Sequence, residues 1–226
     1  MKKLFTAIIL FLPLFGIAQT TSEPKPAGSN DDATIWTNAI VKNPKDTDAY
    51  INRGHVKANK NNYRGAIADY NQAILLNPLS ASTYYDRAQE KEHINDNAGA
   101  IADYTRSVQL NPKQADAWYN LGVLKARNGN YKAAIGDWTN TIHLNTGFPG
   151  VYYNRALAKA KLLEYDAAVA DYTEAIGQNP QNAAAYYGRG NARHHTPDKT
   201  GACDDWEKAA KLGYNAAFEN IKNFCR

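Results

Sequence analysis

The side chains best suited to metal chemistry lie near the carboxyl end of this 226-residue chain. His194, His195 and Cys203 carry the nitrogen and sulfur atoms that bind transition metals. Adjacent histidines on a helix point about 100° apart, and no second His/Cys pair stands at ligand spacing. We therefore interpret these residues as polar groups near a turn and predict no metal site.

Carboxylates are the next candidates for chemistry, but they follow a repeating pattern. An aspartate stands before an aromatic residue five times: Asp69, Asp103, Asp137, Asp171 and Asp205. An arginine precedes a small residue in four of the same units: Arg53, Arg87, Arg155 and Arg189. We predict structural Arg–Asp ion pairs between neighbouring helices, because partly buried charges need partners. The third unit has Leu121 instead, so we expect Asp137 to use an arginine of a neighbouring unit.

These residues recur because the chain is built from a repeat of constant length. Aromatic residues stand 34 positions apart at Tyr70, Tyr104, Trp138, Tyr172 and Trp206. Small residues keep the same register at Gly54, Ala88, Gly122, Ala156 and Gly190, and again at Ala66, Ala100, Ala134, Ala168 and Ala202. No insertion disturbs the frame, which predicts a repeat architecture. The repeating carboxylates therefore indicate structure, and with no nucleophile motif or phosphate-binding loop we predict no enzyme and no cofactor.

Each unit is predicted to form two helices. Within residues 47–80, Ala66, Tyr70 and Ile74 follow helical spacing, and Pro78 ends the second helix. A helix hairpin of this size cannot bury its apolar face alone, so neighbouring units must stack. The pattern predicts an all-α solenoid.

The motif resembles the tetratricopeptide repeat (TPR). The first unit carries the family's pattern at Tyr50, Gly54, Tyr63, Ala66, Tyr70, Ala73 and Pro78. The resemblance covers residues 47 to about 214, with departures at Asn97, Ser107, Thr141, Thr146 and Tyr214. It implies a right-handed solenoid of antiparallel helix hairpins.

The resemblance also implies that first-helix positions line a concave, peptide-binding groove. Tyrosines follow the repeat aromatic at Tyr85, Tyr119, Tyr153 and Tyr187, and the next positions include Asn52, Asp86, Asn120 and Asn154. The variable groove residues are His55, Asp86, Gln89, Arg127 and Asn191. Tyrosines supply rigid contact area, and amides can bond a peptide backbone. The alternative is that the tyrosines pack against the next repeat.

Some members of the family clamp the terminal carboxylate of chaperones with Asn and basic residues. Asn120 and Asn154 match the asparagines of that clamp. The positions of its cations hold Ile51, Tyr85, Tyr119, Asp116, Gly150 and Ala184. We therefore predict no carboxylate clamp of this kind.

Residues 1–18 have the pattern of a bacterial secretory signal peptide, with Lys2 and Lys3 before a short apolar run. We expect cleavage before Gln19 and a periplasmic or secreted protein. The alternative, an uncleaved anchor, needs about 20 apolar residues to span a bilayer, and the run is shorter. No cysteine near the cut indicates lipid attachment, and no later segment predicts an integral membrane span.

The remaining chain divides into a linker, the repeats and two end caps. Residues 19–30 are polar and proline-containing, which predicts a disordered linker. We expect residues 31–46 to form an N-terminal half-repeat cap, and residues 215–226 to form a final capping helix whose Ala217, Phe218, Ile221 and Phe224 face the array. The five repeats are 47–80, 81–114, 115–148, 149–182 and 183–214.

Cys203 and Cys225 are the two cysteines of the sequence. In an exported chain, an even pair favours a disulfide, which would tie the last repeat to the capping helix. A loop of this length would contribute on the order of 3 kcal/mol. The alternative is two buried thiols.

Composition fits a protein-binding role. The net charge of +4 becomes +2 without residues 1–18, since 26 − 2 − 22 = +2. This near balance disfavours nucleic acid as a partner. The sequence predicts a non-enzymatic adaptor or assembly factor that binds a protein or peptide. The alternative is a structural component of a larger envelope or secretion complex.

Overall fold

The computed structural model describes residues 33–225, and the regular structure within them is α-helical. The described residues form twelve helices: α1 (Ala33–Lys42), α2 (Thr47–Asn59), α3 (Tyr63–Leu76), α4 (Ala81–His93), α5 (Asn97–Leu110), α6 (Ala115–Arg127), α7 (Tyr131–Leu144), α8 (Val151–Lys161), α9 (Tyr165–Gln178), α10 (Ala183–His194), α11 (Lys199–Lys211) and α12 (Ala217–Phe224).

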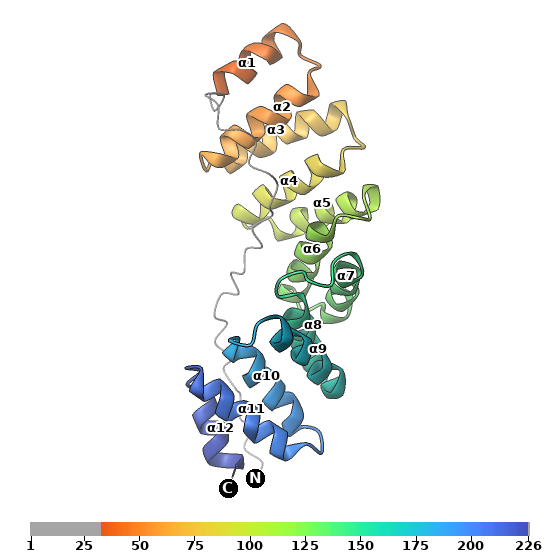
Figure 1. The fold of residues 1–226 in the computed structure, drawn as a ribbon. Coiled ribbons are helices and arrows are strands. Elements are labelled where there is room, and N and C mark those ends of the chain that lie inside the picture. Colours follow the sequence, from red (N-terminus) through yellow and green to blue (C-terminus); the bar gives the residue numbers. More distant parts are fainter. Residues whose placement is uncertain (1–32, 226) are drawn as a thin grey trace, which may run out of the picture.

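Five hairpins, from α2–α3 to α10–α11, are stacked one on the next along the molecule (Figure 1). We call α2, α4, α6, α8 and α10 the first helices, and their partners the second helices. The prediction of an all-α repeat array is confirmed. The predicted signal peptide and linker lie outside the described residues.

Four of the five hairpin turns share one backbone feature. A residue with positive φ ends the first helix at Asn61, Asn95, Gly129 and Leu163. In the first three hairpins the following residue caps the second helix, because its side chain accepts a hydrogen bond from a backbone N–H three residues on. In the fourth hairpin, Glu164 makes no such bond. This turn therefore combines an unfavourable left-handed leucine with a missing cap.

The core of each repeat is the aromatic residue of its second helix, packed against small residues. These aromatics are nearly or fully buried in all five repeats, and so are the alanines four residues before them. A Cβ atom added to Gly54 would lie 2.5 Å from Cε1 of Tyr70. The small residues are therefore required because the helices approach each other closely.

The junction between repeats 3 and 4 departs from the frame. Gly150 has φ 73, and α8 begins only at Val151. Phe148 is buried beside this turn, with its ring centroid 4.8 Å from that of Tyr119. At this junction the Phe148 ring packs against Tyr119, and the chain makes an additional turn before α8 begins.

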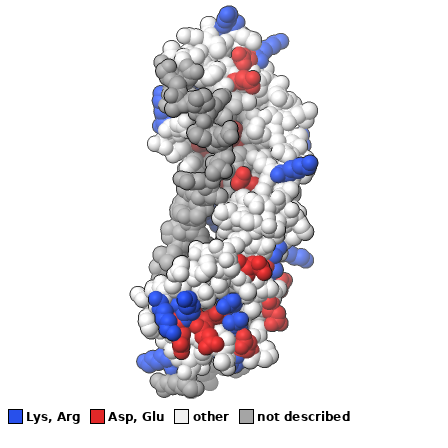
Figure 2. All heavy atoms as spheres, in the orientation of Figure 1, with Lys and Arg blue, Asp and Glu red and all other residues white. Residues whose placement is uncertain are grey.

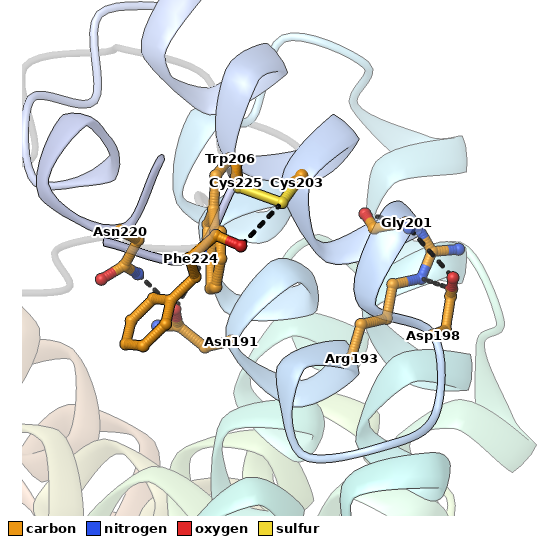
Figure 3. Close-up of a disulfide and its surroundings, with 9 residues drawn as sticks. All are labelled: Asn191, Arg193, Asp198, Gly201, Cys203, Trp206, Asn220, Phe224 and Cys225. Carbon is orange, nitrogen blue, oxygen red and sulfur yellow. Dashed lines mark hydrogen bonds and ion pairs between the residues drawn. A yellow bond between two sulfur atoms is a disulfide. The ribbon is translucent and has the colours of Figure 1, made fainter. Parts of the chain in front are cut away.

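The carboxyl-terminal end is covered by α12 and a disulfide. Cys203 of α11 bonds to Cys225, with 5.6 Å between the two Cα atoms (Figure 3). Ala217, Ile221 and Cys225 pack on the last repeat, at a spacing of four residues that defines the buried stripe of α12. Phe218 lies outside this stripe and is 58% exposed, so the expectation that it faces the array is wrong.

At the amino-terminal end of the array, α1 buries none of its residues.

Within residues 33–225, no helix combines the length and apolar character needed to cross a membrane.

Candidate functional site

The five first helices form one continuous face of the array, which we call the inner face. Helix α8 contacts both α6 and α10 directly. Side-chain bonds also join successive first helices: His55 to Asp86 (2.9 Å), Asn120 to the Tyr85 hydroxyl (3.3 Å) and Asn154 to the Tyr119 hydroxyl (2.9 Å). These bonds fix α2, α4, α6 and α8 relative to one another.

Two tyrosines of the predicted groove are buried. Tyr85 and Tyr119 are 8% and 7% exposed, so the expectation that they present open contact surface is wrong. The ring of Tyr85 packs edge-on against Tyr104 of its own repeat, at 5.5 Å between centroids. Its hydroxyl accepts a hydrogen bond from Asn120 of the next repeat. The next repeat therefore closes over these rings.

Tyr153 and Tyr187 remain half-buried at the carboxyl-terminal part of the inner face. The Tyr153 ring meets Tyr172 edge-on, and Tyr187 stacks on Tyr214. The position that holds Asn120 and Asn154 in earlier repeats holds Gly188 in the last one. Glycine has no side chain to cover Tyr153, which leaves this ring more open.

The polar groups of the predicted groove are partly used within the protein. Asn154 donates to the Tyr119 hydroxyl, and Asn120 donates to the hydroxyls of Tyr85 and Tyr104. Asn52 donates to the Asp48 carbonyl of its own helix, at 2.8 Å. The carbonyl oxygen of Asn191 accepts from the indole of Trp206 and from Asn220 (Figure 3). Gln89 makes a weaker contact with a tyrosine hydroxyl, at 3.4 Å.

The predicted Arg–Asp pairs between first and second helices are confirmed in four repeats. Each arginine contacts both oxygens of its aspartate, as Arg87 does with Asp103 at 2.8 and 2.6 Å. A further N–H reaches the preceding repeat, where Arg87 donates to Asn71 (2.7 Å). The arginines therefore join the two helices of one hairpin and also join neighbouring hairpins.

Sequence reasoning missed a basic position that is present in every repeat. Its members pair with the same aspartates and are Lys57, Lys91, Lys125, Lys159 and Arg193. Their constant spacing of four residues after the arginine position would have revealed them. Asp137 pairs with Lys125 of its own repeat at 2.8 Å. The expectation that it uses an arginine of a neighbouring unit is therefore wrong.

Glu90 is a further residue that sequence reasoning missed. Its side chain is on α4, one turn after Asp86, and the residue is 8% exposed. The equivalent positions of the other repeats hold Val56, Leu124, Ala158 and Ala192, all buried. Aligning the repeats in their frame would therefore have marked Glu90 as a charge at an apolar position. Burial raises its pKa to about 7, with the charge of Asp86 adding to the effect.

The histidines and cysteine considered for metal binding have other partners. Cys203 is part of the disulfide. The His194 ring lies 4.4 Å from that of Phe224, and His195 stacks on Tyr165 at the same centroid distance. These rings contribute to packing around the last repeat.

Charge on the surface is mixed in sign. On the side of the molecule drawn in Figure 2, Lys and Arg lie among Asp and Glu, and the described residues form no extended patch of one sign there. The main concentration of charged groups on this side is near the carboxyl-terminal end, where both signs occur together.

The geometry defines an array of stacked helix hairpins with constant internal spacing, and comparison with known proteins identifies its family. Models described as the tetratricopeptide repeat or TPR repeat match residues 47–78, 94–129 and 153–218. The chain therefore belongs to the TPR proteins.

Several solved structures have the same fold. YrrB, described as a TPR protein with an unusual peptide-binding site, is 21% identical, and the match covers 84% of this chain and 100% of that one with a TM-score of 0.78. The MamA protein is 26% identical over 76% of this chain and 93% of its own, with a TM-score of 0.70. The C-terminal part of a TPR repeat-containing protein from Cytophaga hutchinsonii is 18% identical over 81% and 74%, with a TM-score of 0.67. No curated protein sequence matches the chain.

Proposed function

We propose that this protein is a non-enzymatic adaptor or assembly factor that binds an extended segment of another protein on its inner face. The observation that carries the proposal is the set of side-chain bonds that join α2 to α4, α4 to α6 and α6 to α8, which hold these four first helices in one geometry. A preformed surface loses little conformational entropy when a ligand binds. The peptide-binding site named for YrrB, which shares the fold, also supports the proposal.

The contact area differs from the tyrosine stripe that the sequence predicts. Tyr85 and Tyr119 support the surface from beneath, because both are buried. Tyr153 and Tyr187 are half-buried, and therefore supply accessible aromatic area at one end of the face. His55 and Asp86 supply polar groups at the other end. Rigid aromatic contacts of this kind often dominate binding energy.

The test is a crosslinked pull-down of the full chain from its own cells. Wild type is compared with the double variant Tyr153→Ala/Tyr187→Ala. Tyr165→Ala is a matched control, because this tyrosine stacks on His195 and belongs to α9, a second helix. We expect a partner that wild type and control capture and the double variant loses. Capture by all three would move the contact to another face, and would favour a structural component of a larger envelope or secretion complex.

We further propose that the protein acts outside the cytoplasm. Two features support this: the signal-like pattern of residues 1–18 and the Cys203–Cys225 disulfide, a bond typical of oxidising compartments. The test is cell fractionation followed by amino-terminal sequencing of the recovered chain. A cytoplasmic chain that retains Met1 would contradict the proposal, whereas an exported chain that begins at Gln19 would support it.

A further inference from the structure

We propose that His55, Tyr70, Asp86 and Glu90, which we call the acidic cluster, bind a lysine or arginine side chain of the partner segment. The cluster lies at the seam between repeats 1 and 2 of the inner face. The inference rests on the proposed peptide-binding function and specifies the chemistry that one part of the face selects.

The first argument is that Glu90 carries a charge where the other repeats use apolar residues. Burying a carboxylate without a partner costs several kcal/mol. Val56 and Leu124 show that the position accepts an aliphatic side chain in this array. Glu90 is therefore unfavourable for folding alone, and a ligand would compensate for its burial.

The second argument is that Glu90 has an unused buried oxygen. Three buried side-chain atoms in the described residues lack a hydrogen bond: Oε2 of Glu90, Oδ2 of Asp137 and Nε of Arg193. The Asp137 and Arg193 atoms still lie within 2.8 and 3.1 Å of an opposite charge. Oε2 of Glu90 has neither kind of partner among the residues described, so its capacity to accept a donor is free.

The third argument is the direction in which the cluster faces. Asp86 and Glu90 are four residues apart, which puts both on one side of α4. Asp86 reaches across the seam to His55 of α2, whose side chain is 47% exposed. The His55 ring in turn lies edge-on to Tyr70 of α3, at 5.7 Å between centroids. Solvent therefore reaches the acidic cluster at His55 and Asp86 on the inner face, whereas Glu90 beside them is buried.

A basic side chain matches this cluster better than a metal ion. The described residues contain no group of three His, Cys, Asp or Glu placed to hold a metal. A lysine ammonium has three donors and an arginine guanidinium has five. Either can satisfy Glu90 and Asp86 together and form the charge-assisted bonds that are strongest. A cation beside Glu90 also favours its ionised form, so binding at neutral pH releases a proton.

The experiment begins with peptides selected for binding to the full chain from a random 15-residue library. In the tightest peptide, each Lys or Arg is replaced by norleucine, which keeps an aliphatic stem and removes the charge. We expect one such replacement to weaken binding to wild type at least tenfold. Glu90→Gln and Asp86→Asn should bind the two peptides with nearly equal affinity. Glu174→Gln, which neutralises an exposed carboxylate of α9, is the control and should discriminate as wild type does.

Titration calorimetry in two buffers of different ionisation enthalpy gives a second readout. At pH 7 the basic peptide should release protons on binding to wild type, and this release should be absent with Glu90→Gln. Peptides that bind without preference for a basic residue would overturn the acidic-cluster inference and leave the adaptor proposal standing. A library that yields no binding peptide would overturn both.

Discussion

Asp137 shows at the scale of one residue how the array tolerates a break in its pattern. Leu121 occupies the place of the arginine and is buried in the core cluster of repeats 2 and 3. Among the described residues, Lys125 is the basic residue that forms an ion pair with Asp137. Burial raises the pKa of Asp137, an effect that Lys125 opposes. The other four aspartates each have two basic partners.

This difference predicts unequal costs for the same substitution. Lys125→Met should lower the free energy of unfolding by about 3 kcal/mol, because it leaves a buried carboxylate without a partner. Lys91→Met is the matched control and should cost about 1 kcal/mol, since Arg87 still holds Asp103. Guanidinium unfolding followed by circular dichroism measures both. Equal losses would contradict the view that Asp137 depends on one cation.

Glu90 predicts an unusual pH dependence of stability. Its pKa in the folded protein is about 7, above the ordinary value of 4.5, so the folded state binds the proton more tightly than the unfolded state. The contribution of Glu90 to stability is therefore fully present below about pH 4.5 and is lost as pH rises through 7. The neighbouring titratable groups are His55, Tyr70 and Asp86.

Unfolding free energies at pH 5.5 and pH 8 test this prediction. The difference in stability between wild type and Glu90→Gln should change by on the order of 1–2 kcal/mol between the two pH values, with wild type relatively more stable at pH 5.5. Wild type and Glu90→Gln share all other titrating groups, so the difference in stability between them isolates the effect of Glu90. A difference in stability that stays constant with pH would show that Glu90 is ionised in the folded protein at both pH values.

At the scale of the elements, the hairpin turns differ in how well their residues suit positive φ, although the helices they join are alike. Asn61, Asn95 and Gly129 suit positive φ, whereas Leu163 does not. Leu163 is also largely exposed, so its side chain contributes little burial in return. The turn between α8 and α9 is therefore the least favourable of the four.

Leu163→Asn should stabilise the protein by about 1 kcal/mol, because asparagine tolerates the left-handed region at lower cost. Leu162→Asn is the control: Leu162 has φ −90, so the same chemical change there brings no backbone gain. Thermal unfolding of the two variants beside wild type is sufficient. A gain at both positions would indicate an effect of lost surface hydrophobicity instead of backbone strain.

The sequence predicts the elements well because they depend on local spacing. The 34-residue frame indicates each hairpin, and the recurrence of Arg53 and Asp69 indicates their pairing. The burial of Tyr85 and Tyr119 could not be predicted from the spacing of residues within one repeat. It depends on Asn120 and Asn154 closing over them from the next repeat, a contact between units that spacing within one unit does not encode. Glu90 was missed because a single carboxylate in a helix usually faces solvent.

For the whole molecule, the disulfide closes the end of the array. A terminal repeat has a neighbour on one side only, so it frays more readily than internal repeats. The Cys203–Cys225 bond closes a loop of 22 residues and holds α12 against α11. The stability that it adds is therefore concentrated at this end.

Cys203→Ser/Cys225→Ser should increase amide hydrogen exchange in α11 and α12 and leave α4–α7 unchanged. The loss of local opening free energy should be on the order of 3 kcal/mol. Mass spectrometry of exchange in oxidised, reduced and variant protein measures this directly. Faster exchange throughout the chain would mean that the array unfolds as one unit.

The uneven bonding between repeats has a mechanical consequence. The seam between repeats 2 and 3 has the Asn120–Tyr85 bond on the inner face, whereas Leu121 takes the place of the arginine that elsewhere reaches back to the preceding repeat. The seam between repeats 4 and 5 is the reverse, because Arg189 reaches Thr173 while Gly188 provides no inner-face side chain. Under tension the first seam should therefore open between α5 and α6 and the second between α8 and α10, so the array should not open evenly.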